Sequence, residues 1–188
     1  MEKVTEGWLM REFTARAKAC QLEVDCLGSG KLDSEICVIA EAPGETECKM
    51  SMPLVGGAGR LLWDTLRPFD IGRSDCYVTN VVKKQVALST KTDARSPVKK
   101  PELEHWEGLL QWELDHLPNL KYVLALGNFA LQALVGETGI TKWRGSVFDC
   151  KVGRKGRVVK VIVTNNPGHI IRSLALEPMY KFDIAKLR

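Results

Sequence analysis

Apolar residues recur along the 188-residue chain in two alternating patterns, short continuous runs and helical spacings. The continuous runs predict buried strands at 36–40 (ICVIA), 76–82 (CYVTNVV) and 121–126 (KYVLAL). Apolar residues at helical spacing predict helices at 4–19, 58–68, 101–116 and 128–135. Two further runs around a turn at 153–156 predict a hairpin over 146–163, and one or two helices end the chain.

Strands that alternate with helices favour parallel pairing through right-handed crossovers, with helices on both faces of the sheet. We therefore expect an α/β fold, a three-layer α/β/α sandwich around a central, mostly parallel four-stranded sheet. Residues 1–188 contain no internal repeat and no low-complexity linker, so we expect one domain. Ligands of such sheets bind beyond the carboxyl ends of the strands. Three segments are expected at that edge: 41–47, Asn80 and 165–172.

The composition is that of an ordinary globular protein, with 45% hydrophobic and 27% charged residues. No apolar run approaches the roughly 20 residues that span a bilayer, and no signal-peptide core precedes residue 20. We expect a cytoplasmic or nucleoid-associated protein that is neither secreted nor membrane-bound. Residues 1–80 carry 9 Lys and Arg against 13 Asp and Glu, whereas residues 81–188 carry 18 against 10. This asymmetry suits a surface that faces a polyanion, although a solvated face gives the same pattern.

Three motifs follow one another along the chain. The first is 38–47 (VIAEAPGETE) with 53–62 (PLVGGAGRLL), the second is 77–83 (YVTNVVK), and the third is 166–172 (NPGHIIR). Together they resemble the uracil-DNA glycosylases over about residues 36 to 182, most closely family 4, the iron–sulfur-containing group. The resemblance implies a water-positioning motif, a loop that covers the base, a base-reading Asn and a DNA-insertion loop.

The implied function is that of a DNA glycosylase that excises uracil, or a modified or mismatched pyrimidine, by hydrolysis of the N-glycosidic bond. The nucleotide must leave the base stack first, and catalysis then depends on preorganised electrostatics around the departing base. The expected partners are single- or double-stranded DNA and the free pyrimidine product, and we expect a monomer. The alternative is a weak or inactive member of the superfamily that acts as a DNA- or base-binding module.

The resemblance assigns catalytic roles to Glu41 and Asn166. A carboxylate in the position of Glu41 can orient a water molecule, with the backbone around Ala42 assisting, although a solvated loop Glu is the alternative. Asn80 offers a donor and an acceptor to the O4 and N3–H of uracil, or else caps a turn at the strand end. The substrate-binding residues implied by the resemblance are Ala42, Pro43, Gly44, Leu54 and Asn80.

Two of these residues depart from the family pattern. Leu54 stands where the family has a Phe that stacks on uracil, and stacking on an aromatic ring is worth about 1–3 kcal/mol per base. Leu54 is equally compatible with an ordinary core position. Asn166 stands where the family usually has a His, and it resembles the mismatch-specific branch in this respect. An amide at this position can donate a hydrogen bond only as a neutral group, so we expect reduced catalysis.

The residues expected to contact DNA are Gly57, Arg60, His169, Ile170, Ile171 and Arg172. In this interpretation Ile170 and Ile171 form an apolar wedge and Arg172 meets a phosphate, whereas the alternative is that both Ile residues pack on the core. A basic stretch is expected to add phosphate contacts through Lys83, Lys84, Lys91, Arg95, Lys99 and Lys100. Glu45 and Glu47 are expected to face solvent or end a helix, with one of them able to support the loop.

The cysteines argue against a cofactor. The chain contains Cys20, Cys26, Cys37, Cys48, Cys76 and Cys150, with no C-x-x-C pair and no His spacing typical of zinc sites. The resembled family uses a close Cys pair near the N-terminus and two more Cys around the segment after the Asn-ending strand. Cys20 and Cys26 are too far apart for that pair, and residues 83–112 contain no Cys. We therefore predict no iron–sulfur cluster, no other metal and no cofactor. Cys37 and Cys76 are expected to act as small buried hydrophobes.

Overall fold

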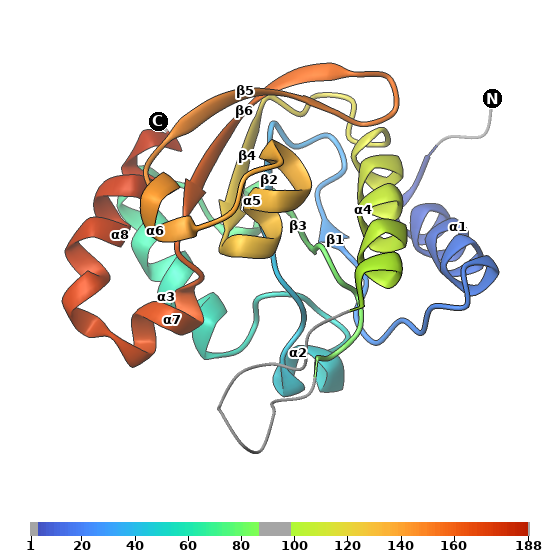
Figure 1. Cartoon of the computed structure of the whole chain (residues 1–188), viewed down its shortest axis with the longest axis horizontal. Coiled ribbons are helices and arrows are strands. Elements are labelled where there is room, and N and C mark those ends of the chain that lie inside the picture. Colours follow the sequence, from blue (N-terminus) through green and yellow to red (C-terminus); the bar gives the residue numbers. More distant parts are fainter. Residues whose placement is uncertain (1–3, 87–98, 188) are drawn as a thin grey trace.

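Four parallel strands form the centre of the protein (Figure 1). The structure, a computed structural model, describes residues 4–86 and 99–187. The strands lie in the spatial order β3 (Cys76–Asn80), β2 (Ile36–Ala40), β4 (Tyr122–Leu126) and β6 (Arg157–Thr164). Two antiparallel strands flank them, β1 (Ser29–Gly30) beside β3 and β5 (Val147–Val152) beside β6.

The predicted α/β/α sandwich with a mostly parallel sheet is confirmed, and the sheet has six strands where four were expected. The hairpin strand β5 widens it at one edge. At the other edge β1 is only two residues long, too short for an apolar pattern to reveal it. No helix within the described ranges is both long and apolar enough to cross a membrane.

Helices cover both faces of the sheet (Figure 1). One face packs against α1 (Glu6–Ala19), α4 (Lys100–Leu114) and α5 (Asn128–Val135). The other packs against α3 (Gly57–Leu66), α7 (Pro167–Arg172) and α8 (Glu177–Ile184). Two short helices, α2 (Glu45–Met50) and α6 (Ile140–Trp143), lie in segments for which the sequence predicted no helix. Single turns of 3₁₀ helix occupy Arg67–Phe69, Arg73–Asp75, Leu174–Leu176 and Ala185–Leu187.

Burial on both faces explains why the strands are almost continuously apolar. Cys37 and Ile39 belong to the core beneath α1 and α4, whereas Val38 and Ala40 belong to the core beneath α3 and α8. Successive side chains of a strand point to opposite faces, so each residue of such a strand meets a helix layer. Cys37 and Cys76 are completely buried, which confirms their expected role as small hydrophobes.

The carboxyl ends of the parallel strands lie at one edge of the sheet. Ala40 stands opposite Asn80, and Leu126 stands opposite Thr164. The pairing of β2 and β3 continues past Ala40, since the N–H of Val82 donates to the carbonyl of Glu41 at 3.0 Å. The segments after β2, β3 and β6 therefore start at the same edge, as the sequence predicted.

Candidate functional site

The side chain of Asn80 is buried at the end of β3 with an unsatisfied donor. The residue is 2% exposed, and its Nδ2 is buried without a hydrogen-bond partner. An unpaired buried donor costs about 1–3 kcal/mol, so such groups call for an explanation. A ligand that supplies an acceptor to this amide is one such explanation.

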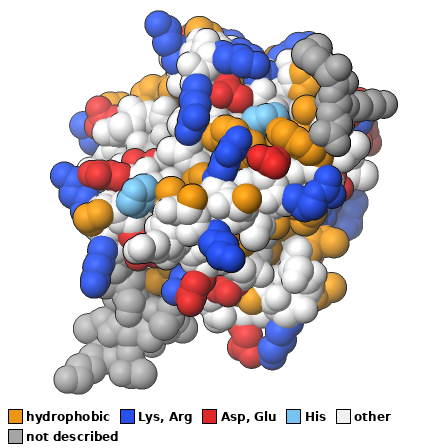
Figure 2. Space-filling view, turned by 90° about the vertical axis from the view of Figure 1, so that its right-hand side faces the viewer, with side chains coloured by type: hydrophobic (Ala, Val, Ile, Leu, Met, Phe, Trp, Pro, Cys, Tyr) orange, Lys and Arg blue, Asp and Glu red, His pale blue; other side chains and the backbone are white. Residues whose placement is uncertain are grey.

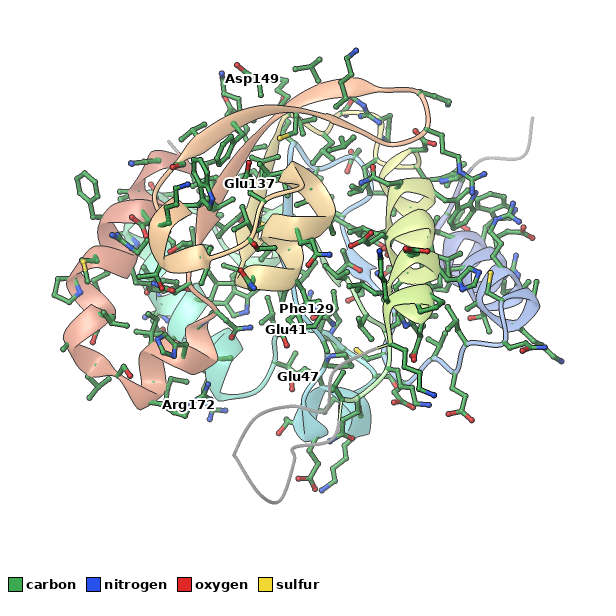
Figure 3. The ribbon with its side chains drawn as sticks, viewed as in Figure 1. Glu41, Glu47, Phe129, Glu137, Asp149 and Arg172 are labelled. Carbon is green, nitrogen blue, oxygen red and sulfur yellow. The ribbon has the colours of Figure 1, made fainter. Side chains whose placement is uncertain are left out.

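Glu41 is the first residue after β2, and β2 lies next to β3, the strand that Asn80 ends. It is half-buried, as is Ala42, while Pro43 is buried. Gly44 precedes the first turn of α2 and packs closely on that helix, because a Cβ at this position would lie 2.7 Å from Glu47 Oε2. Figure 3 shows Glu41 and Glu47 at the same end of the sheet.

Glu47 joins the segment after β2 to the loop that follows α2. Its carboxylate is buried, and Oε1 accepts a hydrogen bond from the backbone N–H of Gly56 at 2.7 Å. Glu45 is instead exposed and pairs with Lys49 at 2.6 Å, and this hydrogen bond lowers the pKa of Glu45. Of the two acids, Glu47 is therefore the one that supports the loop.

Leu54 is buried in the core between β2, α3 and α7, with 6% of the residue exposed. Its backbone is left-handed, with φ of +53°, a conformation that costs a non-glycine residue about 1–2 kcal/mol. The carbonyl of Leu54 accepts a hydrogen bond from Trp63 Nε1 at 2.9 Å. A Cβ on Gly59 would lie 1.8 Å from the same oxygen, so this glycine is what lets α3 approach the loop. The observed contacts are those of a core leucine.

Asn166 caps helix α7 with its side chain. Oδ1 accepts a hydrogen bond from the N–H of Gly168 at 2.9 Å. The cap therefore uses the oxygen of the amide and does not use its Nδ2 donor. Gly127, at the end of β4, has φ of +91°, and a Cβ there would lie 3.2 Å from the Cβ of Asn166. The glycine therefore allows the segment after β6 to pass close to the end of β4.

Helix α7 corrects one of the expected DNA contacts. Ile170 is 0% exposed and packs in the core, because this side of α7 faces the apolar cluster that also contains residues of α3 and α8. The prediction that Ile170 forms part of a surface wedge is therefore wrong. Ile171 is 46% exposed, and His169 and Arg172 are exposed as well.

A small cluster of exposed groups surrounds Ile171. A Cβ on Gly57 would lie 3.7 Å from Ile171 Cδ1 and 3.8 Å from a guanidinium nitrogen of Arg60. Leu174, 66% exposed, follows two residues after Arg172 and was not singled out from the sequence. The sequence feature that could have identified Leu174 is an apolar residue two positions after the end of the third motif.

The prediction that Lys83 contacts DNA phosphates is wrong. This side chain is completely buried, and its Nζ lies 2.8 Å from Glu113 Oε2. Lys84 remains partly exposed and pairs with Glu23 at 2.6 Å. Lys99 and Lys100 are exposed, while the predictions for Lys91 and Arg95 lie outside the described residues. On the face that α1 and α4 cover, basic side chains are interspersed with acidic ones (Figure 2).

The donor set does not fit an iron–sulfur cluster, which is held by Cys thiolates. Of the two N-terminal cysteines, Cys26 is buried and Cys20 is half-buried. The segment after β3 presents Lys84 to this region, where it pairs with Glu23. Among residues 4–86 and 99–187 no group of three or more His, Cys, Asp or Glu side chains is placed to hold a metal ion.

The fold and the site together define an α/β protein with a buried, unpaired side-chain donor, Nδ2 of Asn80, at the carboxyl edge of its sheet. The family model of the uracil DNA glycosylase superfamily matches residues 27–184, and the chain belongs to this superfamily.

Three relatives that match most of the chain are named type-4 uracil-DNA glycosylase. The Thermotoga maritima protein is 33% identical over 175 residues, which cover 90% of this chain and 85% of the relative. The Archaeoglobus fulgidus protein is 32% identical over 166 residues, 85% of this chain and 78% of the relative. The Pyrobaculum aerophilum protein is 30% identical over 164 residues, which cover 84% of this chain and 79% of the relative. The resemblance that the three motifs predicted is thereby confirmed.

Proposed function

We propose that the protein is a DNA glycosylase that hydrolyses the N-glycosidic bond of uracil, or of a modified or mismatched pyrimidine. The names of its relatives support the reaction class. The observation that carries the proposal is the buried, unpartnered Nδ2 of Asn80 at the carboxyl edge of the sheet. Uracil offers an acceptor at O4 and a donor at N3, the complement of an amide, whereas cytosine presents the opposite pattern.

We assign the chemistry to residues that follow the strands at the same edge of the sheet as Asn80. The target nucleotide rotates out of the stack, and the departing base accumulates negative charge as the glycosidic bond breaks. With Oδ1 of Asn166 held by Gly168, its Nδ2 is the group that donates to the O2 of the base. Glu41 orients the water that attacks the sugar, with Ala42, Pro43 and Gly44 shaping the loop around it. Leu54 contributes apolar contact beneath the base.

DNA binds in this proposal across the exposed surface of α7 and the start of α3. Ile171 enters the base stack as the wedge, since it is the exposed apolar residue of the motif. Arg60 and Arg172 contact phosphates on either side of it, and Gly57 and His169 lie along the same surface.

The protein is further proposed to act as a monomer without an iron–sulfur cluster. The set of possible ligands supports the absence of a cluster, because residues 83–112 contain no Cys and the described residues hold no group of three or more His, Cys, Asp or Glu side chains placed for a metal ion. Elemental analysis of the purified protein is expected to find no stoichiometric iron. A stoichiometric iron content with the visible absorbance of a cluster would contradict this part of the proposal.

Incubation with oligonucleotides tests the function. Single strands and duplexes that carry one U, opposite A or G, are treated with the protein and then with alkali, which cleaves abasic sites. We expect cleavage by the native protein, no cleavage by Asn80→Ala, and unchanged cleavage by Asn119→Ala, a control at an exposed position. DNA binding without cleavage of any pyrimidine lesion would favour the non-catalytic binding module instead.

A further inference from the structure

A buried ion pair lies behind Asn80 and has no role in the proposed chemistry. Nζ of Lys83 lies 2.8 Å from Oε2 of Glu113, and the two side chains are 0% and 2% exposed. Removal of two charges from water is expensive, and replacement of such a pair by uncharged residues of similar volume is often neutral or stabilising. Stability is thus a weak explanation for the pair, and its geometry indicates a more specific task.

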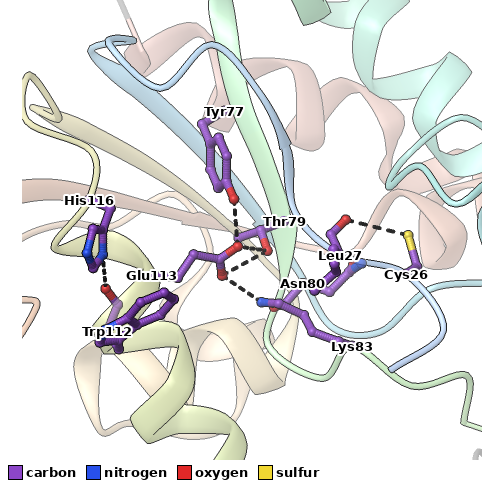
Figure 4. A network of polar contacts seen from close by, with 9 residues as sticks. All are labelled: Cys26, Leu27, Tyr77, Thr79, Asn80, Lys83, Trp112, Glu113 and His116. Atoms are coloured by element: carbon purple, nitrogen blue, oxygen red, sulfur yellow. Dashed lines mark hydrogen bonds and ion pairs between the residues drawn. The ribbon is translucent and has the colours of Figure 1, made fainter. Parts of the chain in front are cut away.

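Glu113, on α4, receives its hydrogen bonds from the strand that carries Asn80 (Figure 4). The hydroxyl of Tyr77 donates to Oε1 at 2.7 Å, and Oγ1 of Thr79 lies 3.1 Å from each carboxylate oxygen. Tyr77 and Thr79 are alternate residues of β3, so they point to the same face of the sheet. The carboxylate therefore fixes the last residues of β3 against α4.

Lys83 extends this network to Asn80 itself. Its Nζ donates to the backbone oxygen of Asn80 at 2.5 Å while it pairs with Glu113. The backbone oxygen of Lys83 accepts hydrogen bonds from the N–H groups of Asp25 and Cys26, at 2.9 and 3.0 Å. The chain therefore bends after β3 into a turn that is held at its start by a side chain and at its end by the N-terminal loop.

Gly28 closes the network from the N-terminal side. A Cβ at this position would lie 2.3 Å from Glu113 Oε1, 2.6 Å from the hydroxyl of Tyr77 and 2.8 Å from Thr79 Oγ1. Backbone thus packs directly on the polar groups and excludes water from this side. Hydrogen bonds in such a low-dielectric environment are stronger and hold their geometry more firmly.

We propose that Lys83 and Glu113 are positioning residues that fix the peptide of Asn80, so that its unpaired amide is oriented before a base arrives. This inference rests on the proposed function, because it assumes that Asn80 reads the base. The amide has no partner for its Nδ2, so its backbone is the part of the residue that the protein holds through hydrogen bonds. A displacement of about 1 Å at such a group can lower a rate about 100-fold.

The double variant Lys83→Met/Glu113→Gln separates positioning from stability. It removes both charges and keeps the side-chain volumes, and the Gln oxygen can still accept from Tyr77 and Thr79. We expect a cooperative unfolding transition close to that of the native protein, with kcat/KM on uracil-containing DNA lowered about 10- to 100-fold. The control Lys121→Met, at an exposed lysine that pairs with Glu35, is expected to change neither quantity.

A second measurement does not depend on excision. The side-chain amide signals of Asn80 in ¹⁵N-labelled protein, assigned by their loss in Asn80→Ala, are expected to shift or broaden in the double variant. Tyr77→Phe, which removes one hydrogen bond to Glu113, provides a milder variant if the double variant does not fold, with the same change expected. Unchanged amide signals in a folded variant would overturn the positioning role. A native protein that excises no uracil would overturn the proposed function alone, since the amide signals still test the positioning.

Discussion

The carboxylate of Glu47 accepts a hydrogen bond from the backbone N–H of Gly56 at 2.7 Å, and both residues are buried. This contact joins the segment after β2 to the start of α3, so the two halves of the first sequence motif, 38–47 and 53–62, form one unit. The neighbouring acid Glu45 makes an exposed pair with Lys49 instead.

We therefore expect Glu47→Ala to destabilise the protein by about 1–3 kcal/mol, because it leaves the buried N–H of Gly56 without an acceptor. Glu45→Ala is the matched control and is expected to change stability by less than about 0.5 kcal/mol. Urea unfolding of both variants measures the difference. Equal midpoints for the two variants would show that the Glu47 contact contributes nothing to the loop.

Gly59 and Gly108 form a second matched pair. A Cβ on Gly59 would meet the backbone oxygen of Leu54 at 1.8 Å, whereas a Cβ on Gly108 would have no neighbour within 4 Å. Gly59→Ala is expected to displace the loop, to destabilise the protein by several kcal/mol, above about 3, and to abolish excision. Gly108→Ala, within α4, is expected to stabilise by about 0.5–1 kcal/mol. Thermal unfolding and the oligonucleotide assay test both, and a stable, active Gly59→Ala variant would contradict the packing described.

Asn166→Asp separates the cap of α7 from the proposed chemistry. Asp caps helices about as well as Asn, so the unfolding temperature is expected to remain close to that of the native protein. The variant has no amide donor for the O2 of the base, so the rate constant of excision in single-turnover assays is expected to fall by about 10²–10³-fold. Asn166→Ala is expected to show the same fall in the rate constant of excision and, in addition, to lose about 1 kcal/mol of stability because the cap is removed. Full activity in Asn166→Asp would remove Asn166 from the catalytic set.

Ile171→Ala tests the proposed wedge. A wedge residue assists extrusion of the base from a duplex, so we expect kcat/KM to fall about tenfold on U·G duplexes and much less on single strands. Phe182→Ala, at an even more exposed apolar residue of α8, is the control and is expected to leave both substrates unaffected. Equal losses on single and double strands would argue against a wedge at Ile171.

Stability is expected to fall at alkaline pH. Burial raises the pKa of the Cys26 and Cys76 thiols to about 12, from an ordinary value of 9.0. Above pH 9 the unfolded chain loses these protons while the folded protein retains them, so the stabilisation present below pH 9 is lost progressively up to about pH 12. Unfolding midpoints measured from about pH 8 to 11 test this, and the Cys26→Ala/Cys76→Ala variant is expected to show a shallower decline. An identical decline in that variant would place its cause in other groups.

The main strands, their parallel pairing and the position of the three motifs at their carboxyl ends were predictable from the sequence. The strands β2, β3 and β4 are buried on both faces, so their apolar runs are continuous and visible without any tertiary information. Asn80 was identified instead from the resemblance of residues 77–83 to a glycosylase motif, since the apolar run itself continues through Val81 and Val82.

Which of two neighbouring polar or apolar side chains faces inward was decided only by the tertiary structure. Lys83 rather than Lys84 is buried, because Glu113, 30 residues away in the sequence, supplies a buried carboxylate. Ile170 rather than Ile171 packs in the core, because α7 packs against α3 and turns that side toward the shared apolar cluster. Which of two neighbouring side chains is buried depends on the element that packs opposite them. That element is distant in the sequence, so the local pattern of residues does not predict the contact.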